Sequence, residues 1–225
     1  MALRAAVFDF DGVIVDSEPL HFRALRDALQ GDGVTITPEE YWGRYLAYHD
    51  RAAICLALEH HDEPAPPERV SRLERRKVAR FAELVPEVPV FAGARELVRT
   101  LAGELPLAIA SGARHDEIDA ILRGLDLRDA FDAIVGVDDV ERAKPDPLPY
   151  LEAARRLATN APALSPAECV AFEDSPPGIV SALGAGMRVV GVAHSYKPDK
   201  LESAHRVVPS LLGVTLADLR ALFAS

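Results

Sequence analysis

Cysteine is scarce in this 225-residue sequence, which contains only Cys55 and Cys169. Both lie in otherwise apolar runs, and a disulfide framework needs more cysteines, so we expect two reduced thiols in the core. The sequence also lacks an apolar run of the ~20 residues that a helix needs to span a bilayer. No basic segment followed by an apolar signal opens the chain. We therefore expect a cytoplasmic protein.

Positive charge is the second shortage. Lysine and arginine total 25 against 35 aspartate and glutamate residues, which gives a formal net charge of -10. Such a chain repels nucleic acid and anionic membrane surfaces, so we expect neither as a partner. An anionic small molecule would need a metal ion or a few aimed cations to bind. The 49% of hydrophobic residues is ordinary for a globular protein with a sizeable core.

Short apolar runs recur along the chain and predict strands. Most are apolar at nearly every position, as in strands covered on both faces. The runs are 5–10, 106–111, 132–137, 168–174 and 188–193, with a weaker one at 206–211. Helix-like segments lie between the later runs, at 117–125, 148–158 and 177–184. This alternation predicts an α/β fold with a Rossmann-like parallel sheet and helices on both sides.

One interval breaks this rhythm. Residues 16–85 contain no convincing strand but several amphipathic helical stretches, at 20–30, 38–46, 51–60 and 67–84. The charged run at 71–80 has the pattern of a solvated helix face. We interpret 16–85 as a helical domain inserted between the first strand and the rest of a Rossmann-like core formed by 1–15 and 86–225, with 86–93 as the return linker.

Acidic side chains follow the first and fourth predicted strands. Asp9 and Asp11 end the first, and Glu173 and Asp174 end the fourth. In a parallel sheet these ends lie at the edge where such folds bind ligands. Carboxylates at such short distances repel one another unless a cation lies between them. A site that offers only oxygen ligands favours Mg2+. The sequence therefore predicts a magnesium site at this edge.

Three further residues at the same edge are candidates to hold a phosphate. Ser111 and Gly112 end the second predicted strand and offer a hydroxyl and main-chain N–H groups. Lys144, after the third strand, supplies a compact positive charge. With a phosphate held there, Asp9 can attack phosphorus to form an aspartyl phosphate, and Asp11 can move the proton.

Four segments in order resemble the motifs of the haloacid dehalogenase superfamily. They are DFDGVIVDSEP at 9–19, ASG at 110–112, AKPDP at 143–147 and EDSPPGI at 173–179. The resemblance covers essentially the whole chain. It is strongest to the branch with a helical cap after the first strand, which contains phosphoglycolate phosphatase-like and β-phosphoglucomutase-like enzymes.

The resemblance implies Mg2+ as the cofactor. It implies that Asp9 is the nucleophile and a metal ligand, and that Asp11 is the acid/base and a ligand through its main-chain carbonyl. It further implies phosphate binding by Ser111 and Lys144, and a metal site completed by Asp174 with Glu173. Dehalogenation is not expected, because members with that chemistry lack the second aspartate and the metal.

Within the predicted cap, His21 and Lys77 match residues that link cap closure to the acid/base aspartate and the phosphate in β-phosphoglucomutase-like members. The alternative, an exposed helical histidine and one lysine in a charged run, stays open. Candidates for substrate selection are His49, Arg51, Tyr45 and Tyr48.

The loop between the first two cap helices bears on the reaction. The mutase group carries a glycine and an arginine there to grip the far phosphate of a bisphosphate. Here the segment 45–54, YLAYHDRAAI, has no glycine, and Arg51 is shifted. The serine-rich stretch of that group is replaced by GARH at 112–115. We therefore predict a phosphatase acting on a small phosphorylated metabolite such as a sugar phosphate, with a β-phosphoglucomutase-like mutase as the alternative.

A non-enzymatic phosphoaccepting receiver module is a remote alternative, because it also combines an aspartyl phosphate, magnesium and a Lys-Pro pair. The second aspartate at the first strand end, the long insertion and a lysine that precedes the last acidic pair argue against it. A capped active site needs no second subunit, so we expect a monomer.

Overall fold

The computed structural model describes residues 2–46, 48–159, 161 and 163–224. The chain divides into two compact units. The sheet unit comprises Met1–Asp16 and Pro89–Ser225, and the helical unit comprises Ser17–Val88. Among the described residues, no helix is both long and apolar enough to cross a membrane.

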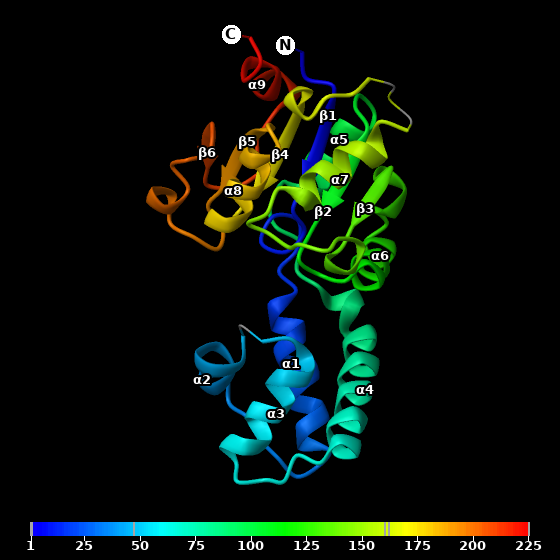
Figure 1. Cartoon of the computed structure of the whole chain (residues 1–225), viewed down its shortest axis with the longest axis vertical. Coiled ribbons are helices and arrows are strands. Elements are labelled where there is room, and N and C mark those ends of the chain that lie inside the picture. Colours follow the sequence, from blue (N-terminus) through cyan, green and yellow to red (C-terminus); the bar gives the residue numbers. More distant parts are fainter. Residues whose placement is uncertain (1, 47, 160, 162, 225) are drawn as a thin grey trace. The chain divides into compact units, whose positions relative to one another are not determined.

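The sheet unit is built on six parallel strands (Figure 1). They are β1 (Ala5–Phe8), β2 (Leu107–Ala110), β3 (Ala133–Val135), β4 (Cys169–Glu173), β5 (Arg188–Val192) and β6 (Arg206–Val208). Its helices are α5 (Ala94–Ala102), α6 (His115–Gly124), α7 (Leu148–Leu157), α8 (Pro176–Gly184) and α9 (Leu216–Ala221). The predicted α/β fold is confirmed, and α5 and α9 are helices that the sequence pattern had not singled out.

The strand order is β3-β2-β1-β4-β5-β6, so the order reverses between β1 and β4. In doubly wound sheets the crevice at this reversal is where ligands bind, outside the carboxyl ends of the strands. Phe8 of β1 pairs with Phe172 of β4, and their rings stack with centroids 4.5 Å apart. This register brings the residues that follow the two strands to the same level at the edge of the sheet.

Small side chains line one face of the sheet. Alanines of β1, β2, β3 and β4 pack there against Tyr150 and Leu157 of α7 and Ile179 of α8. Phe8 and Phe172, whose side chains alternate to the opposite face, are also completely buried. The sheet is therefore covered on both faces, as its continuously apolar strands predict.

The helical unit contains α1 (Glu18–Gln30), α2 (Pro38–Glu40), a π-helical turn (Tyr41–Tyr45), α3 (Asp50–His60) and α4 (Pro67–Leu84). It has its own apolar core, in which Leu29, Tyr45, Ile54, Leu58 and Leu73 are almost fully buried. The predicted helix at 38–46 is instead a short α-helix followed by the π-helical turn.

The charged run at 71–80 is only partly a solvated face. Leu73 and Lys77 of this run are buried. Arg72 forms an ion pair with Asp32 at 2.6 Å, and Arg80 forms one with Asp27 at 2.8 Å. The arginines of α4 therefore pair with acids in and just after α1, which an arrangement of charges along one helix cannot reveal.

Candidate active site

The first strand ends in a tight turn that presents Asp9 and Asp11. Asp9 N donates to Phe172 O at 2.9 Å, and Phe10 N donates to Asp9 Oδ1 at 2.7 Å. Gly12 has a φ of +81°, and its N donates to Val15 O at 2.9 Å. A Cβ at Gly12 would lie 1.9 Å from Asp174 Oδ2, so only glycine lets the turn approach this carboxylate.

A lysine bridges the ends of β1 and β4. Lys144 Nζ lies 2.9 Å from Asp9 Oδ1 and 2.6 Å from Glu173 Oε1. Its ammonium also lies 5.1 Å from the centre of the Tyr150 ring. The sequence-predicted residues Asp9, Lys144 and Glu173 are thus in direct contact, although they come from three different segments of the chain.

Glu173 is completely buried and accepts several hydrogen bonds besides the one from Lys144. Tyr150 Oη donates to its Oε1 at 2.8 Å. Its Oε2 accepts from Asp174 N at 3.1 Å and from Ser175 Oγ at 3.1 Å. Burying a carboxylate is costly unless it is paired and hydrogen-bonded, and these donors meet that requirement.

Burial and crowding perturb the acids of the cluster. Burial, followed by the negative charge of Glu173, raises the pKa of Asp9 well above its usual range, against the opposing charge of Lys144. Burial raises the pKa of Asp174 to about 6. Burial alone would lower the pKa of Lys144, but the charges of Asp9 and Glu173 raise it above its usual value.

Ser111 and Gly112 lie at the end of β2, next to β1 in the sheet. Ser111 is buried, its N donates to Val135 O at 2.9 Å, and its Oγ accepts from Ala113 N at 3.1 Å. Gly112 is exposed, and α6 begins three residues later at His115. The turn therefore presents main-chain groups at the same edge of the sheet as the acids.

The donor set of this cluster fits a hard divalent cation. Asp9, Glu173 and Asp174 each offer one oxygen, and these oxygens lie within 4.8 Å of one another. Three buried carboxylates against one lysine leave an excess of negative charge, which a cation bound by oxygen ligands would balance.

His21 and Lys77, two candidate functional residues of the predicted cap, lie together in the helical unit. Lys77 is 4% exposed, and its Nζ lies 2.8 Å from His21 Nδ1 and 2.8 Å from Asp50 Oδ1. The His21 ring stacks on Phe81 with centroids 4.4 Å apart. Lys77 is therefore not an exposed lysine of a charged face but a buried cation with two polar partners.

The other candidates of the helical unit lie near its loop before α3. His49 is exposed, and its Nδ1 accepts from Ala52 N at 3.5 Å as the N-cap of α3. Tyr48 is exposed, whereas Tyr45 is buried in the core. Arg51 Nη1 lies 3.1 Å from Glu74 Oε2, so a residue of α4 balances its charge.

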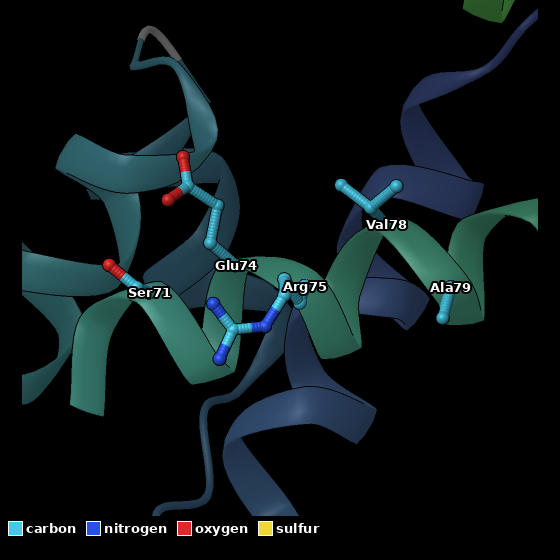
Figure 2. Close-up of a pocket in the computed structure, with 5 residues that line it drawn as sticks. All are labelled: Ser71, Glu74, Arg75, Val78 and Ala79. Atoms are coloured by element: carbon cyan, nitrogen blue, oxygen red, sulfur yellow. The ribbon is translucent and has the colours of Figure 1, made fainter. Parts of the chain in front are cut away.

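Ser71 and Glu74, which Arg51 contacts, lie on a pocket of about 450 Å³ on α4 (Figure 2). The pocket is lined by Ser71, Glu74, Arg75, Val78 and Ala79. These five side chains share one face of α4, since they are spaced three and four residues apart. Arg51 Nη1 also lies 3.4 Å from Ser71 Oγ. The two polar residues Ser71 and Glu74 of the pocket are therefore both bound to Arg51 of the helical unit.

Three residues that sequence reasoning missed support the predicted ones. Tyr150 donates a hydrogen bond to Glu173, and Asp50 forms an ion pair with Lys77. His194 Nδ1 donates to Gly12 O at 2.9 Å, and its ring stacks on Phe91. Tyr150 follows the AKPDP segment by three residues, and this proximity is the only signal that could have indicated it.

A doubly wound sheet with acids and a lysine gathered where the strand order reverses is the arrangement of an α/β enzyme with a site rich in carboxylates. The chain matches the haloacid dehalogenase-like hydrolase family over residues 3–186 and belongs to that family.

Its similar proteins include several sugar-phosphate phosphatases. The chain is 34% identical to a phosphorylated carbohydrates phosphatase of Thermotoga maritima, over 88% of this chain and 89% of that protein. It is 32% identical to hexitol phosphatase B of Escherichia coli, over 96% of both chains. The crystal structure of CbbY from Rhodobacter sphaeroides in complex with phosphate superposes with a TM-score of 0.79, at 28% identity, over 96% of this chain and 99% of that one.

The contact between Tyr150 and Glu173 yields a stability prediction. Tyr150→Phe removes a buried donor to a carboxylate, so we expect the free energy of unfolding to fall by about 1–3 kcal/mol. Tyr196→Phe is the matched control, because Tyr196 is 46% exposed and its change should stay within about 0.5 kcal/mol. Urea unfolding of both variants tests this, and equal stabilities would contradict the assigned contact.

Proposed function

We propose that this protein is a Mg2+-dependent phosphatase that hydrolyses a small phosphorylated sugar or sugar alcohol through an aspartyl phosphate on Asp9. The observation that carries the proposal is the contact of Lys144 with both Asp9 and Glu173 at the sheet's switch point. A cation held between two carboxylates at a strand end meets the need of phosphoryl transfer for positioning and charge neutralisation.

The choice of substrate class rests on the family relatives. Three of them are described as a phosphorylated carbohydrates phosphatase, a hexitol phosphatase and a fructose-1-phosphate phosphatase. The substrates in these names carry their phosphate on a polyhydroxylated carbon chain. We infer a substrate of the same chemical class for this chain.

The roles of the first two aspartates follow from their positions in the turn after β1. Asp9 attacks phosphorus, because its carboxylate is buried and fixed by Phe10 N and Lys144. Asp11, two residues on, donates a proton to the leaving oxygen and then takes one from the attacking water. Because Asp9 and Asp11 lie on one short turn, their spacing stays the same while the aspartyl phosphate forms and while water hydrolyses it.

The phosphate is held by groups from the ends of β2 and the segment before α7. Ser111 and the main chain of Gly112 supply hydrogen bonds at the strand-to-helix turn, and Lys144 supplies charge. The ion pairs with Asp9 and Glu173 keep the pKa of Lys144 high, so its ammonium stays charged when a phosphate arrives. Glu173 and Tyr150 thereby position Lys144.

The residues proposed to hold Mg2+ are Asp9, Asp174, the main-chain carbonyl of Asp11, and Glu173. When bound, Mg2+ neutralises the carboxylates and orients the phosphoryl group. The positive charge of a bound Mg2+ would oppose the rise in the pKa of Asp9 that burial and the charge of Glu173 cause, and would so favour the carboxylate that attacks phosphorus.

We propose that 16–85 acts as a cap that selects the substrate, with His21, Lys77, His49 and Arg51 as its candidate functional residues. Lys77 donates to His21 Nδ1, so a neutral His21 carries its proton on Nε2 and acts as a donor from that atom. Asp50 positions Lys77 for this task.

The helical unit favours hydrolysis over a mutase reaction. A mutase must hold a second phosphate of a bisphosphate intermediate, whereas Arg51 is paired with Glu74 and Lys77 with Asp50. A second phosphate would have to displace a carboxylate at either cation. The mutase remains the second candidate, because the crystal structure of a putative β-phosphoglucomutase from Thermotoga maritima is similar to this chain, with a TM-score of 0.76 at 32% identity.

The role of Asp9 predicts the effect of a conservative substitution. Asp9→Asn keeps the size of the side chain but removes the nucleophilic oxygen, so we expect release of phosphate from p-nitrophenyl phosphate with Mg2+ to fall at least about 1,000-fold. Asp126→Asn is the matched control, because the Asp126 side chain is 99% exposed, and it should retain the wild-type rate. A folded Asp9→Asn variant with substantial turnover would contradict the proposed nucleophile.

The pKa of Asp174 predicts how magnesium activation depends on pH. Below pH of about 6 the carboxyl binds a proton, which Mg2+ must displace, and above it the carboxylate is already charged. The Mg2+ concentration for half-maximal activity should therefore rise as the pH falls below about 6, by up to about tenfold per unit. Rate titrations with MgCl2 from pH 5 to 8 measure this constant. A value independent of pH would argue against Asp174 as a ligand.

A phosphate-release screen separates the two candidate reactions. We expect release from hexitol phosphates or ketose 1-phosphates, and from β-glucose 1-phosphate without any need for glucose 1,6-bisphosphate. Formation of glucose 6-phosphate without net hydrolysis, dependent on the bisphosphate, would instead establish the mutase.

A further inference from the structure

A second group of metal-type side chains lies wholly within the helical unit. Glu40 ends α2, His60 ends α3, and His61 follows it directly. One donor atom from each of the three lies within 4.8 Å of the others. The reaction proposed above uses none of these residues.

The two distances from the carboxylate to the imidazoles are compatible with metal ligation. Glu40 Oε1 lies 3.5 Å from His60 Nδ1 and 3.6 Å from His61 Nε2. Good N–H···O hydrogen bonds span about 2.7–3.2 Å, so both contacts are longer than a good hydrogen bond. Two ligands about 2.1 Å from a tetrahedral ion lie about 3.4 Å apart, which is close to both distances.

His61 gives an independent indication. Its Nε2 is buried yet has no hydrogen-bond partner among the residues that the structure describes. A buried imidazole nitrogen without a partner is unfavourable, and coordination to an ion would satisfy its lone pair. The side chains of Glu40, His60 and His61 are 21%, 30% and 28% exposed, so the cluster borders solvent.

The surroundings orient the carboxylate toward the histidines. Glu40 Oε2 accepts from Thr37 N at 2.7 Å and Glu40 N donates to Thr37 Oγ1 at 3.2 Å, so a capping box fixes the side chain and leaves Oε1 facing the rings. Tyr45 Oη lies 3.2 Å from His60 Nδ1 and would give up this contact when the nitrogen binds an ion.

We propose that Glu40, His60 and His61 form a site for a transition-metal ion of the Zn2+ class. Two imidazoles and one carboxylate are the donor set of such ions, whereas Mg2+ prefers oxygen alone. Three protein ligands leave a fourth position for water or an external ligand. The ion joins the end of α2 to the end of α3, and so secures the chain on both sides of the loop that carries Tyr48 and His49.

The test uses the full-length protein stripped of metal, with excess Mg2+ present to occupy the carboxylate site of the sheet unit. Zn2+ should bind with one equivalent, raise the melting temperature, and shift the imidazole 15N signals of His60 and His61. Co2+ should give the visible absorption of a four-coordinate nitrogen-containing site.

Matched variants locate the ion. His60→Ala and His61→Ala should each weaken Zn2+ binding more than about tenfold. Glu40→Gln keeps the capping geometry and should weaken Zn2+ binding to a similar degree. This variant still tests the site if a histidine variant folds poorly. His205→Ala, on the sheet unit, should bind as the wild type does. Absence of micromolar binding, or wild-type affinity in the His60, His61 and Glu40 variants, would overturn the proposal.

Discussion

Mutual repulsion of buried carboxylates is the constraint on which the catalytic edge of this protein depends. Asp9, Glu173 and Asp174 are each at most 8% exposed, and their oxygens lie within 4.8 Å of one another. The folded chain tolerates this because Lys144 bridges Asp9 and Glu173, and because Tyr150 and the turn after β4 donate hydrogen bonds to Glu173. The excess negative charge that remains is what a cation bound by these oxygens would balance.

The fold creates this cluster by bringing separate strand ends to one edge. The order of the strands places β1 beside β4, and the pairing of Phe8 with Phe172 sets the level of the residues that follow. Two glycines then leave the room that the carboxylates need. A Cβ at Gly178 would lie 1.9 Å from Glu173 Oε1, and one at Gly12 would lie 1.9 Å from Asp174 Oδ2. Glycine at these two positions therefore lets the main chain pass close to the carboxylates of Glu173 and Asp174.

The sequence was sufficient for the sheet and for the acids at its edge, because continuous apolar runs and strand-end carboxylates are local patterns. It was insufficient for their supports. Tyr150 looks like any apolar residue of α7, and its partner Glu173 lies 23 residues away. Asp50 looks like an ordinary acid in the first turn of α3, yet it pairs with the buried Lys77. Such contacts depend on how helices pack, which periodicity does not encode.

The most direct test of the account is to observe the phosphoryl group on Asp9. A radiolabelled sugar phosphate that the protein hydrolyses is mixed with the Mg2+-loaded enzyme, quenched in acid on the millisecond scale and mapped by peptide. The account predicts a transient, hydroxylamine-sensitive label on the peptide containing Asp9, which decays at the rate of phosphate release. Label on Ser111, or full phosphate release without label on Asp9 at any time, would contradict it.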